Sequence, residues 1–190
     1  MRNVLNATLD LSKGRLTDSS LRTFLYEAAA IVNSRPLTTD NLNDPNSLEP
    51  LTPNHLVTMK TTTALPPPGQ FVKEDLYAQK RWRQVQYLAE QFWSRWKKEY
   101  LQNIMVRQRW HMPKRNMQIG DIVMDKDETQ PRSQWRLGRV LVIVTDKDGL
   151  VRKVKIAFAD RNLNKKGERL HKMSIVERPV HKLVLLLEGC

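Results

Sequence analysis

Apolar positions in the last third of the chain fall into short runs with strand-like spacing. Five such runs, dominated by Val, Ile and Leu, cover residues 121–124, 135–145, 150–158, 174–180 and 183–187. Asp148-Gly149 separates the second run from the third, and Asp-Gly between β-branched runs is a strong hairpin signal because the turn needs positive φ. From Lys153 onward apolar and polar residues alternate, so one face can be buried while the other carries cations. The pattern predicts a small β-barrel with a basic rim.

Two helices are predicted in the first 40 residues. Apolar positions at three- and four-residue steps place the first over residues 4–11, with Gly14 as its stop. The second covers residues 21–32, with N-cap candidates at 17–20. It ends before Pro36, because proline disfavours the α conformation in the preceding residue.

The apolar stripe of this second helix consists of Phe24, Leu25, Ala28 and Ile31. No partner for it is evident within residues 1–50, so we expect the stripe to be exposed and this segment to be poorly ordered or prone to aggregate on its own. Residues 36–70 are rich in Pro, Thr and Asn and are predicted to be loop and linker, with a short helical turn starting at Pro53.

One long helix is predicted over residues 73–112. Its apolar and aromatic side chains recur at three- and four-residue steps, at Trp82, Val85, Ala89, Phe92, Trp96 and Tyr100. Packing in a core is the favoured interpretation of this stripe, ahead of direct stacking on nucleic-acid bases. The cations between these positions fit a solvated helix face and a phosphate-binding face equally well.

The net charge of +12 is distributed unevenly along the 190 residues. Residues 1–70 hold equal numbers of basic and acidic side chains, so residues 71–190 carry the whole excess. A basic half joined to a neutral half indicates a polyanionic partner, with nucleic acid ahead of a membrane surface. No apolar run is long enough to span a membrane.

Catalytic and metal-binding patterns are absent from the sequence. The four histidines are too far apart for a zinc site, and there is no Gly-x-Ser-x-Gly motif or glycine-rich phosphate loop. Asp125, Asp127 and Glu128 lie together, but a solvated turn is favoured there over a two-metal site. Glu27 is interpreted as an ordinary exposed glutamate.

Cations and one tryptophan gather instead on the predicted barrel and the segment before it. Guanidinium groups bind phosphates through two hydrogen bonds, and an indole offers a stacking surface. A place in the barrel core is slightly favoured for the tryptophan. The candidate nucleic-acid-binding residues are Lys114, Arg115, Arg132, Trp135, Arg136, Arg139, Arg152, Lys153 and Lys155.

Six ordered pieces of this chain resemble the C-terminal region of integrases encoded by BEL/Pao-type retrotransposons. They are LTPNHL at 51–56, WxxWxxEYL at 93–101, GDIV at 120–123, PRxxWxLGRV at 131–140, DGxVR at 148–152 and RPVHKL at 178–183. The helix containing Glu27 and the following NSRPLT at 33–38 resemble the tail of the same integrase's ribonuclease-H-like core. The resemblance covers nearly the whole chain.

The resemblance implies a domain organisation and places catalysis outside this chain. Residues 1–60 would be helices of an incomplete core, 61–72 a Pro-rich linker, 73–112 a long aromatic-basic helix and 113–190 an SH3-like barrel. Such integrases join DNA with an Asp-Asp-Glu triad and a divalent metal such as Mg²⁺, and those three residues would precede Met1. The chain alone is therefore expected to hold no cofactor and to have no enzyme activity.

We therefore expect an α+β fragment that binds DNA through its phosphates, in the nucleus and together with other integrase subunits, without a membrane or small-molecule partner. The alternative is a protein-interaction or oligomerisation module of a truncated or domesticated element that does not bind DNA.

Overall fold

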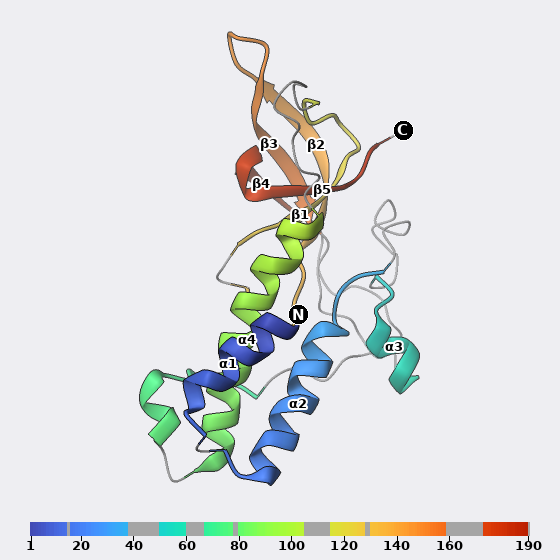
Figure 1. Cartoon of the computed structure of the whole chain (residues 1–190). Helices are drawn as coiled ribbons and strands as arrows, with labels where there is room; N and C mark the ends of the chain where they lie inside the picture. Colours follow the sequence, from blue (N-terminus) through green and yellow to red (C-terminus); the bar gives the residue numbers. More distant parts are fainter. Residues whose placement is uncertain are drawn as a thin grey trace. The chain divides into compact units, whose positions relative to one another are not determined.

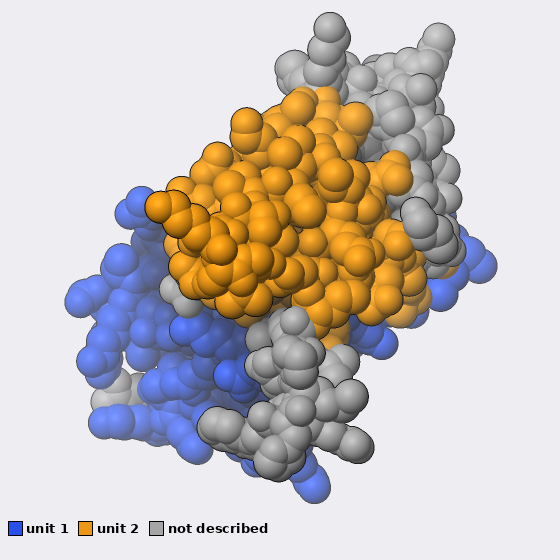
Figure 2. Space-filling model, turned by 90° about the horizontal axis from the view of Figure 1, so that it is seen from above, with its two compact units in different colours: residues 1–35, 52–102, 131–134 blue, residues 36–51, 103–130, 135–190 orange. Residues whose placement is uncertain are grey.

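The computed structural model describes residues 1–14, 16–37, 50–59, 67–77, 80–104, 115–127, 130–158 and 173–189. The chain divides into two compact units, each assembled from separated stretches of sequence (Figure 2). Unit 1 holds residues 1–35, 52–102 and 131–134, and unit 2 holds residues 36–51, 103–130 and 135–190. The α+β class is confirmed, because a long helix is followed by a five-stranded antiparallel sheet. The long helix shares unit 1 with the N-terminal helices, whereas the sequence had suggested a separate segment.

Unit 1 is helical (Figure 1). It contains α1 (Arg2–Leu9), η1 (Asp10–Ser12), α2 (Asp18–Val32), α3 (Pro53–Thr58), η3 (Lys73–Tyr77) and α4 (Arg81–Ile104), where η marks a 3₁₀ turn. The last two residues of α4 are assigned to unit 2.

Local capping signals start two of these helices where the sequence predicted. Thr17 is the N-cap of α2, and its side-chain oxygen accepts a hydrogen bond from the Ser20 backbone N–H at 3.4 Å. At α3, Thr52 and His55 cap each other's backbone N–H groups, and Pro53 occupies the first turn. Both arrangements satisfy N–H groups that have no partner inside the helix.

The prediction of one helix over residues 73–112 is wrong at its beginning. In a continuous helix, Asp75 and Arg83 would be about 12 Å apart along the axis, but Arg83 Nε donates to Asp75 Oδ1 at 2.6 Å. The η3 segment therefore folds back beside the first turns of α4, and Gln84 Nε2 also donates to the Leu76 carbonyl at 3.1 Å. Residues 105–112 of the predicted helix lie outside the described part of the chain.

Helices α2 and α4 bury aromatic side chains against each other. Phe24 on α2 meets Phe92 on α4 edge to face, with ring centroids 6.2 Å apart, and both rings are fully buried. Ala28 and Ile31 are buried as well. The expected exposure of the α2 stripe is therefore wrong for three of its members and holds only for Leu25, which is 41% exposed.

The favoured core interpretation of the α4 stripe is confirmed for Val85, Ala89 and Phe92, which are buried together with the neighbouring Leu88 and Trp93. Trp96 and Tyr100 are only half-buried. Trp82 differs from them because 49% of it is exposed.

Unit 2 contains the predicted antiparallel sheet, with strand order β4-β3-β2-β1-β5. The strands are β1 (Ile122–Asp125), β2 (Leu137–Thr145), β3 (Val151–Phe158), β4 (Ser174–Pro179) and β5 (Leu183–Leu187). All five predicted strands are confirmed. The turn between β2 and β3 has Gly149 at φ 76°, as the Asp-Gly signal required.

The connection between the two outermost strands makes the sheet curl. The 3₁₀ turn η4 (Val180–Lys182) alone joins β4 to β5. Five strands side by side in a flat sheet would place the outer two about 19 Å apart, whereas the four residue steps from Pro179 to Leu183 span at most about 14 Å. The sheet therefore bends toward the small barrel that the sequence predicted.

The core of unit 2 lies on the inner face of this sheet. The cluster contains Met117, Val123, Val140, Val151, Val154, Ile156, Phe158 and Leu183, all buried. On β3 the inward residues Val154, Ile156 and Phe158 leave Lys153 and Lys155 on the opposite face, which is exposed at both lysines.

Candidate nucleic-acid interface

The strand register places three of the predicted cations on one face of the sheet. Lys155 lies opposite Val142 of β2, and Lys153 lies opposite Val144. Arg139 of β2 pairs with Ala157, which is two residues beyond Lys155. Directly paired residues share a face, as do residues two apart on a strand. We call Arg139, Lys153 and Lys155 the basic face.

One acidic and several apolar side chains share this face. Glu177 of β4 is the cross-strand partner of Lys155, and its Oε1 lies 3.4 Å from Nζ of Lys153. Both members of that ion pair are largely exposed, so water screens the attraction and a phosphate oxygen can replace the carboxylate at little cost. Val142 and Val144 are 46% and 43% exposed, so the face presents apolar contacts between its cations.

Arg152 is exposed but already neutralised. Its guanidinium binds Asp146 at 2.8 Å and also binds Asp148, so two carboxylates of the β2–β3 turn surround one cation. The sequence carried the signal for this arrangement, because charged residues on the two sides of a tight hairpin turn lie close together. Arg152 therefore contributes little to the attraction of an anion.

Arg136 and Trp135 are both half-buried in unit 2. The guanidinium carbon of Arg136 lies 4.0 Å from the ring centroid of Phe158, a cation–π contact that holds the side chain. Phe158 is one of the buried core residues. Arg136 thus has a role in packing against the core.

Arg115 is held by carboxylates as well. Its Nη2 donates to Asp121 Oδ1 at 2.9 Å, and its Nε lies 3.4 Å from Glu188 Oε1. Hydrogen bonding to Asp121 raises the pKa of Arg115 above its ordinary value. Lys114, the other predicted residue of this segment, lies outside the described residues.

Arg132 is not available to a ligand, so its prediction as a DNA contact is wrong. Only 2% of the residue is exposed. It lies in unit 1, where Nη2 donates to Gln86 Oε1 at 2.6 Å and to Glu27 Oε2 at 3.2 Å. Nη1 lies 3.7 Å from Glu90 Oε1.

This buried network also corrects the interpretation of Glu27, whose side chain is 29% exposed. Glu27 accepts a second hydrogen bond from Gln86 Nε2 at 3.1 Å. Burial raises the pKa of Glu90, Arg132 opposes that rise, and the nearby Glu27 charge adds to it. No short-range signal marks this network, because Arg132 and Glu27 are 105 residues apart.

The acidic turn after β1 is bound by an arginine. Arg178 Nε lies 3.3 Å from Asp125 Oδ2, and Arg178 Nη2 donates to Asp127 Oδ2 at 3.0 Å. Glu128 lies outside the described residues. Within the described ranges no three His, Cys, Asp or Glu side chains come together to hold a metal ion. The divalent metal implied by the resemblance thus has no fitting donor set among these residues.

Comparison with protein-family models identifies the family of the chain. Residues 80–186, which are more than half of the sequence, match a family of unknown function, DUF5641. The chain belongs to this family. The matched stretch contains the whole of α4 and reaches into β5. Comparisons with curated proteins and with solved structures found no match.

Among the described helices, none is both long enough and apolar enough to cross a membrane.

Proposed function

We propose that this chain is the DNA-binding, non-catalytic part of a retrotransposon-type integrase and that the basic face contacts DNA phosphates. The observation that carries the proposal is that Arg139, Lys153 and Lys155 lie on one face of a curled sheet, where both lysines are exposed and Arg139 is half-buried. Cations held by a rigid strand can follow a phosphate backbone without reading bases. The resemblance to BEL/Pao-type integrases supports the same role, with action in the nucleus beside other integrase subunits.

Salt dependence tests the proposal directly. With the whole chain and a labelled blunt duplex, we expect log affinity to fall linearly with log salt concentration, because bound cations displace counterions. Changing Arg139, Lys153 and Lys155 together to Gln is expected to weaken binding and to reduce the slope by about 2 to 3, since each lost phosphate contact removes about 0.9.

A matched control removes three cations elsewhere. Lys13, Arg22 and Lys98 are exposed in unit 1, and changing them to Gln lowers the net charge equally. This control should keep the wild-type slope. Affinity that does not change between low and physiological salt, or equal slopes for the two triple variants, would exclude phosphate binding by the basic face.

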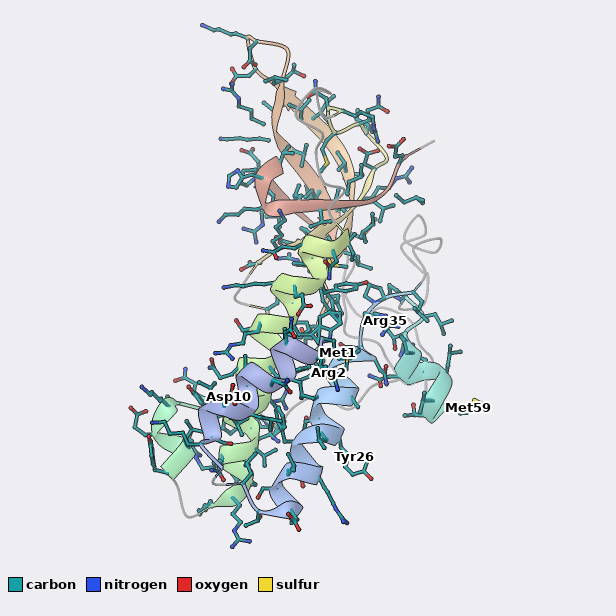
Figure 3. The ribbon with its side chains drawn as sticks, viewed as in Figure 1. Met1, Arg2, Asp10, Tyr26, Arg35 and Met59 are labelled. Atoms are coloured by element: carbon teal, nitrogen blue, oxygen red, sulfur yellow. The ribbon has the colours of Figure 1, made fainter. Side chains whose placement is uncertain are left out.

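A protein-interaction module is the second candidate function, and α3 is the observation that favours it. This helix buries the polar Asn54 while Leu56, Val57 and the following Met59 are 56%, 74% and 90% exposed. Figure 3 shows Met59 pointing outward from α3 and Tyr26, 78% exposed, from α2. If the basic-face triple variant binds DNA like the wild type, this second candidate becomes the better explanation.

A further inference from the structure

Trp82 is a tryptophan of α4 that remains half in solvent, at the beginning of the helix. Its exposed fraction is 49%, against 4% for Trp93 in the same helix. Burial of a tryptophan is strongly favourable, so an indole left in water on a well-packed helix is an informative exception. Neither the core of unit 1 nor the basic face of unit 2 makes use of it.

The exposed indole is held in a fixed position by its neighbours. Phe71 meets Trp82 nearly perpendicularly, with ring centroids 5.8 Å apart. The guanidinium carbon of Arg83 lies 5.7 Å from both ring centroids. We call Phe71, Trp82 and Arg83 the aromatic platform.

Asp75 fixes the arginine of the aromatic platform. Arg83 Nε and Nη2 donate to the two carboxylate oxygens of Asp75 at 2.6 and 3.2 Å, and the Val72 backbone N–H donates to Asp75 Oδ2 at 2.9 Å. Hydrogen bonding from Arg83, and then from Val72, lowers the pKa of Asp75 below its ordinary range. The fold of η3 back against α4 therefore orders the platform before any ligand arrives.

The charge around the platform favours an anionic partner. Lys73, Lys80 and Arg81 are exposed and lie within two residues of Phe71 or Trp82 along the chain, and Glu74 is an exposed carboxylate of the same stretch. Asp75 is already paired with Arg83. A flat π surface with flanking cations is the combination that binds single-stranded nucleic acid, where bases stack on the ring and phosphates meet the cations. A proline-rich peptide also binds aromatic surfaces, but it gains nothing from the cations.

We propose that the aromatic platform is a binding site for single-stranded nucleic acid, in which an unpaired base stacks on Trp82. The site differs from the basic face in ligand and in location. It selects unpaired strands because duplex bases have no exposed face to offer. The chain would then hold a duplex and an unpaired strand at two separate sites.

Two oligonucleotides of equal charge separate stacking from electrostatic attraction. One is a labelled twelve-residue oligo(dT), and the other is an abasic strand of the same length with the same phosphates. The wild-type whole chain is expected to prefer oligo(dT) by about 5- to 150-fold, the range that one stacked base provides. Trp82→Leu, which keeps an apolar side chain against Phe71, should remove that preference, and Trp82→Phe should restore part of it.

Controls keep this test independent of duplex binding and of folding. Tyr26→Ala removes an exposed aromatic residue outside the platform and should leave the preference unchanged. The basic-face triple variant should also retain it, even if duplex binding is lost, and circular dichroism checks that each variant is folded. The proposal would be overturned if the wild type bound both strands equally or if folded Trp82→Leu kept the full preference for oligo(dT). It would also be overturned if an uncharged oligoproline peptide displaced oligo(dT).

Discussion

Changing Arg132 to Met is expected to lower the free energy of unfolding of unit 1 by about 3 kcal/mol, because it leaves buried polar groups without their cation. The guanidinium serves Gln86 and Glu27 through hydrogen bonds and opposes the charge of Glu90. Glu27 and Glu90 are 29% and 35% exposed, so water relieves part of the penalty and the lower end of the usual range applies. The loss is measured by urea unfolding in which hydrogen exchange of the α2 and α4 backbone amides reports the unfolding of unit 1.

A rescue variant and a surface control sharpen this prediction. Adding Glu90→Gln to Arg132→Met should recover part of the loss, because one of two uncompensated carboxylates is removed. Arg22→Ala, at an exposed position of α2, should change the free energy of unfolding by less than about 0.5 kcal/mol. If Arg132→Met behaves like Arg22→Ala, the network does not stabilise the folded unit.

The second large effect is expected at Asp121, which is completely buried in unit 2. Its carboxylate accepts hydrogen bonds from Arg115 Nη2 and from the backbone N–H groups of Gln118 and Gly189, each at 2.9 Å. Asp121→Asn keeps the size of the side chain but brings an NH₂ group toward these donors. The expected loss in free energy of unfolding is about 3 kcal/mol, and denaturant unfolding measures it.

Protonation of the Asp121 carboxylate at low pH should also lower the free energy of unfolding. Burial alone would raise the pKa of Asp121, but the hydrogen bonds from Gln118, Gly189 and Arg115 outweigh it and hold the pKa below its ordinary range. The stabilisation is therefore fully present above the unfolded-state pKa of about 3.9 and is lost as pH falls through the lower folded-state pKa. Stability measured from pH 6 downward should decline at the acid end in the wild type and less steeply in Asp121→Asn.

An exposed carboxylate provides the comparison. Asp146 pairs with Arg152 at 2.8 Å, but its side chain is 47% exposed. Asp146→Asn should cost less than about 1 kcal/mol. Similar losses at the two positions would show that burial of Asp121 does not set its contribution.

Elements with local causes could be predicted from the sequence. The five strands follow from runs of Val, Ile and Leu, and the β2–β3 turn follows from Asp148-Gly149. The starts of α2 and α3 follow from Thr17 and from Thr52 with Pro53. The break before α4 was missed because no proline or glycine marks it between residues 73 and 82. The pairing of Asp75 with Arg83, which holds η3 against α4, cannot be seen in the sequence pattern.

The candidate site could be predicted only in part, because a cation's availability depends on its partners. Lys153 and Lys155 follow from period-two alternation, and their exposure agrees with it. Arg132 has the same chemistry in the sequence but is buried by residues far away in the chain. Phe71 and Trp82 are 11 positions apart, and only the fold of η3 brings their rings together.

The assembly of unit 1 from distant stretches has a consequence for how the chain folds during synthesis. Residues 131–134 belong to this unit, although the strand β1 of unit 2 is made before them. Contacts between residues so far apart form late, since the intervening chain must be closed into a loop. Phe24 therefore meets the ring of Phe92 only after α4 has been made, and Glu27 meets Arg132 later still. Until these contacts form, the apolar side of α2 lacks part of its cover, which favours aggregation.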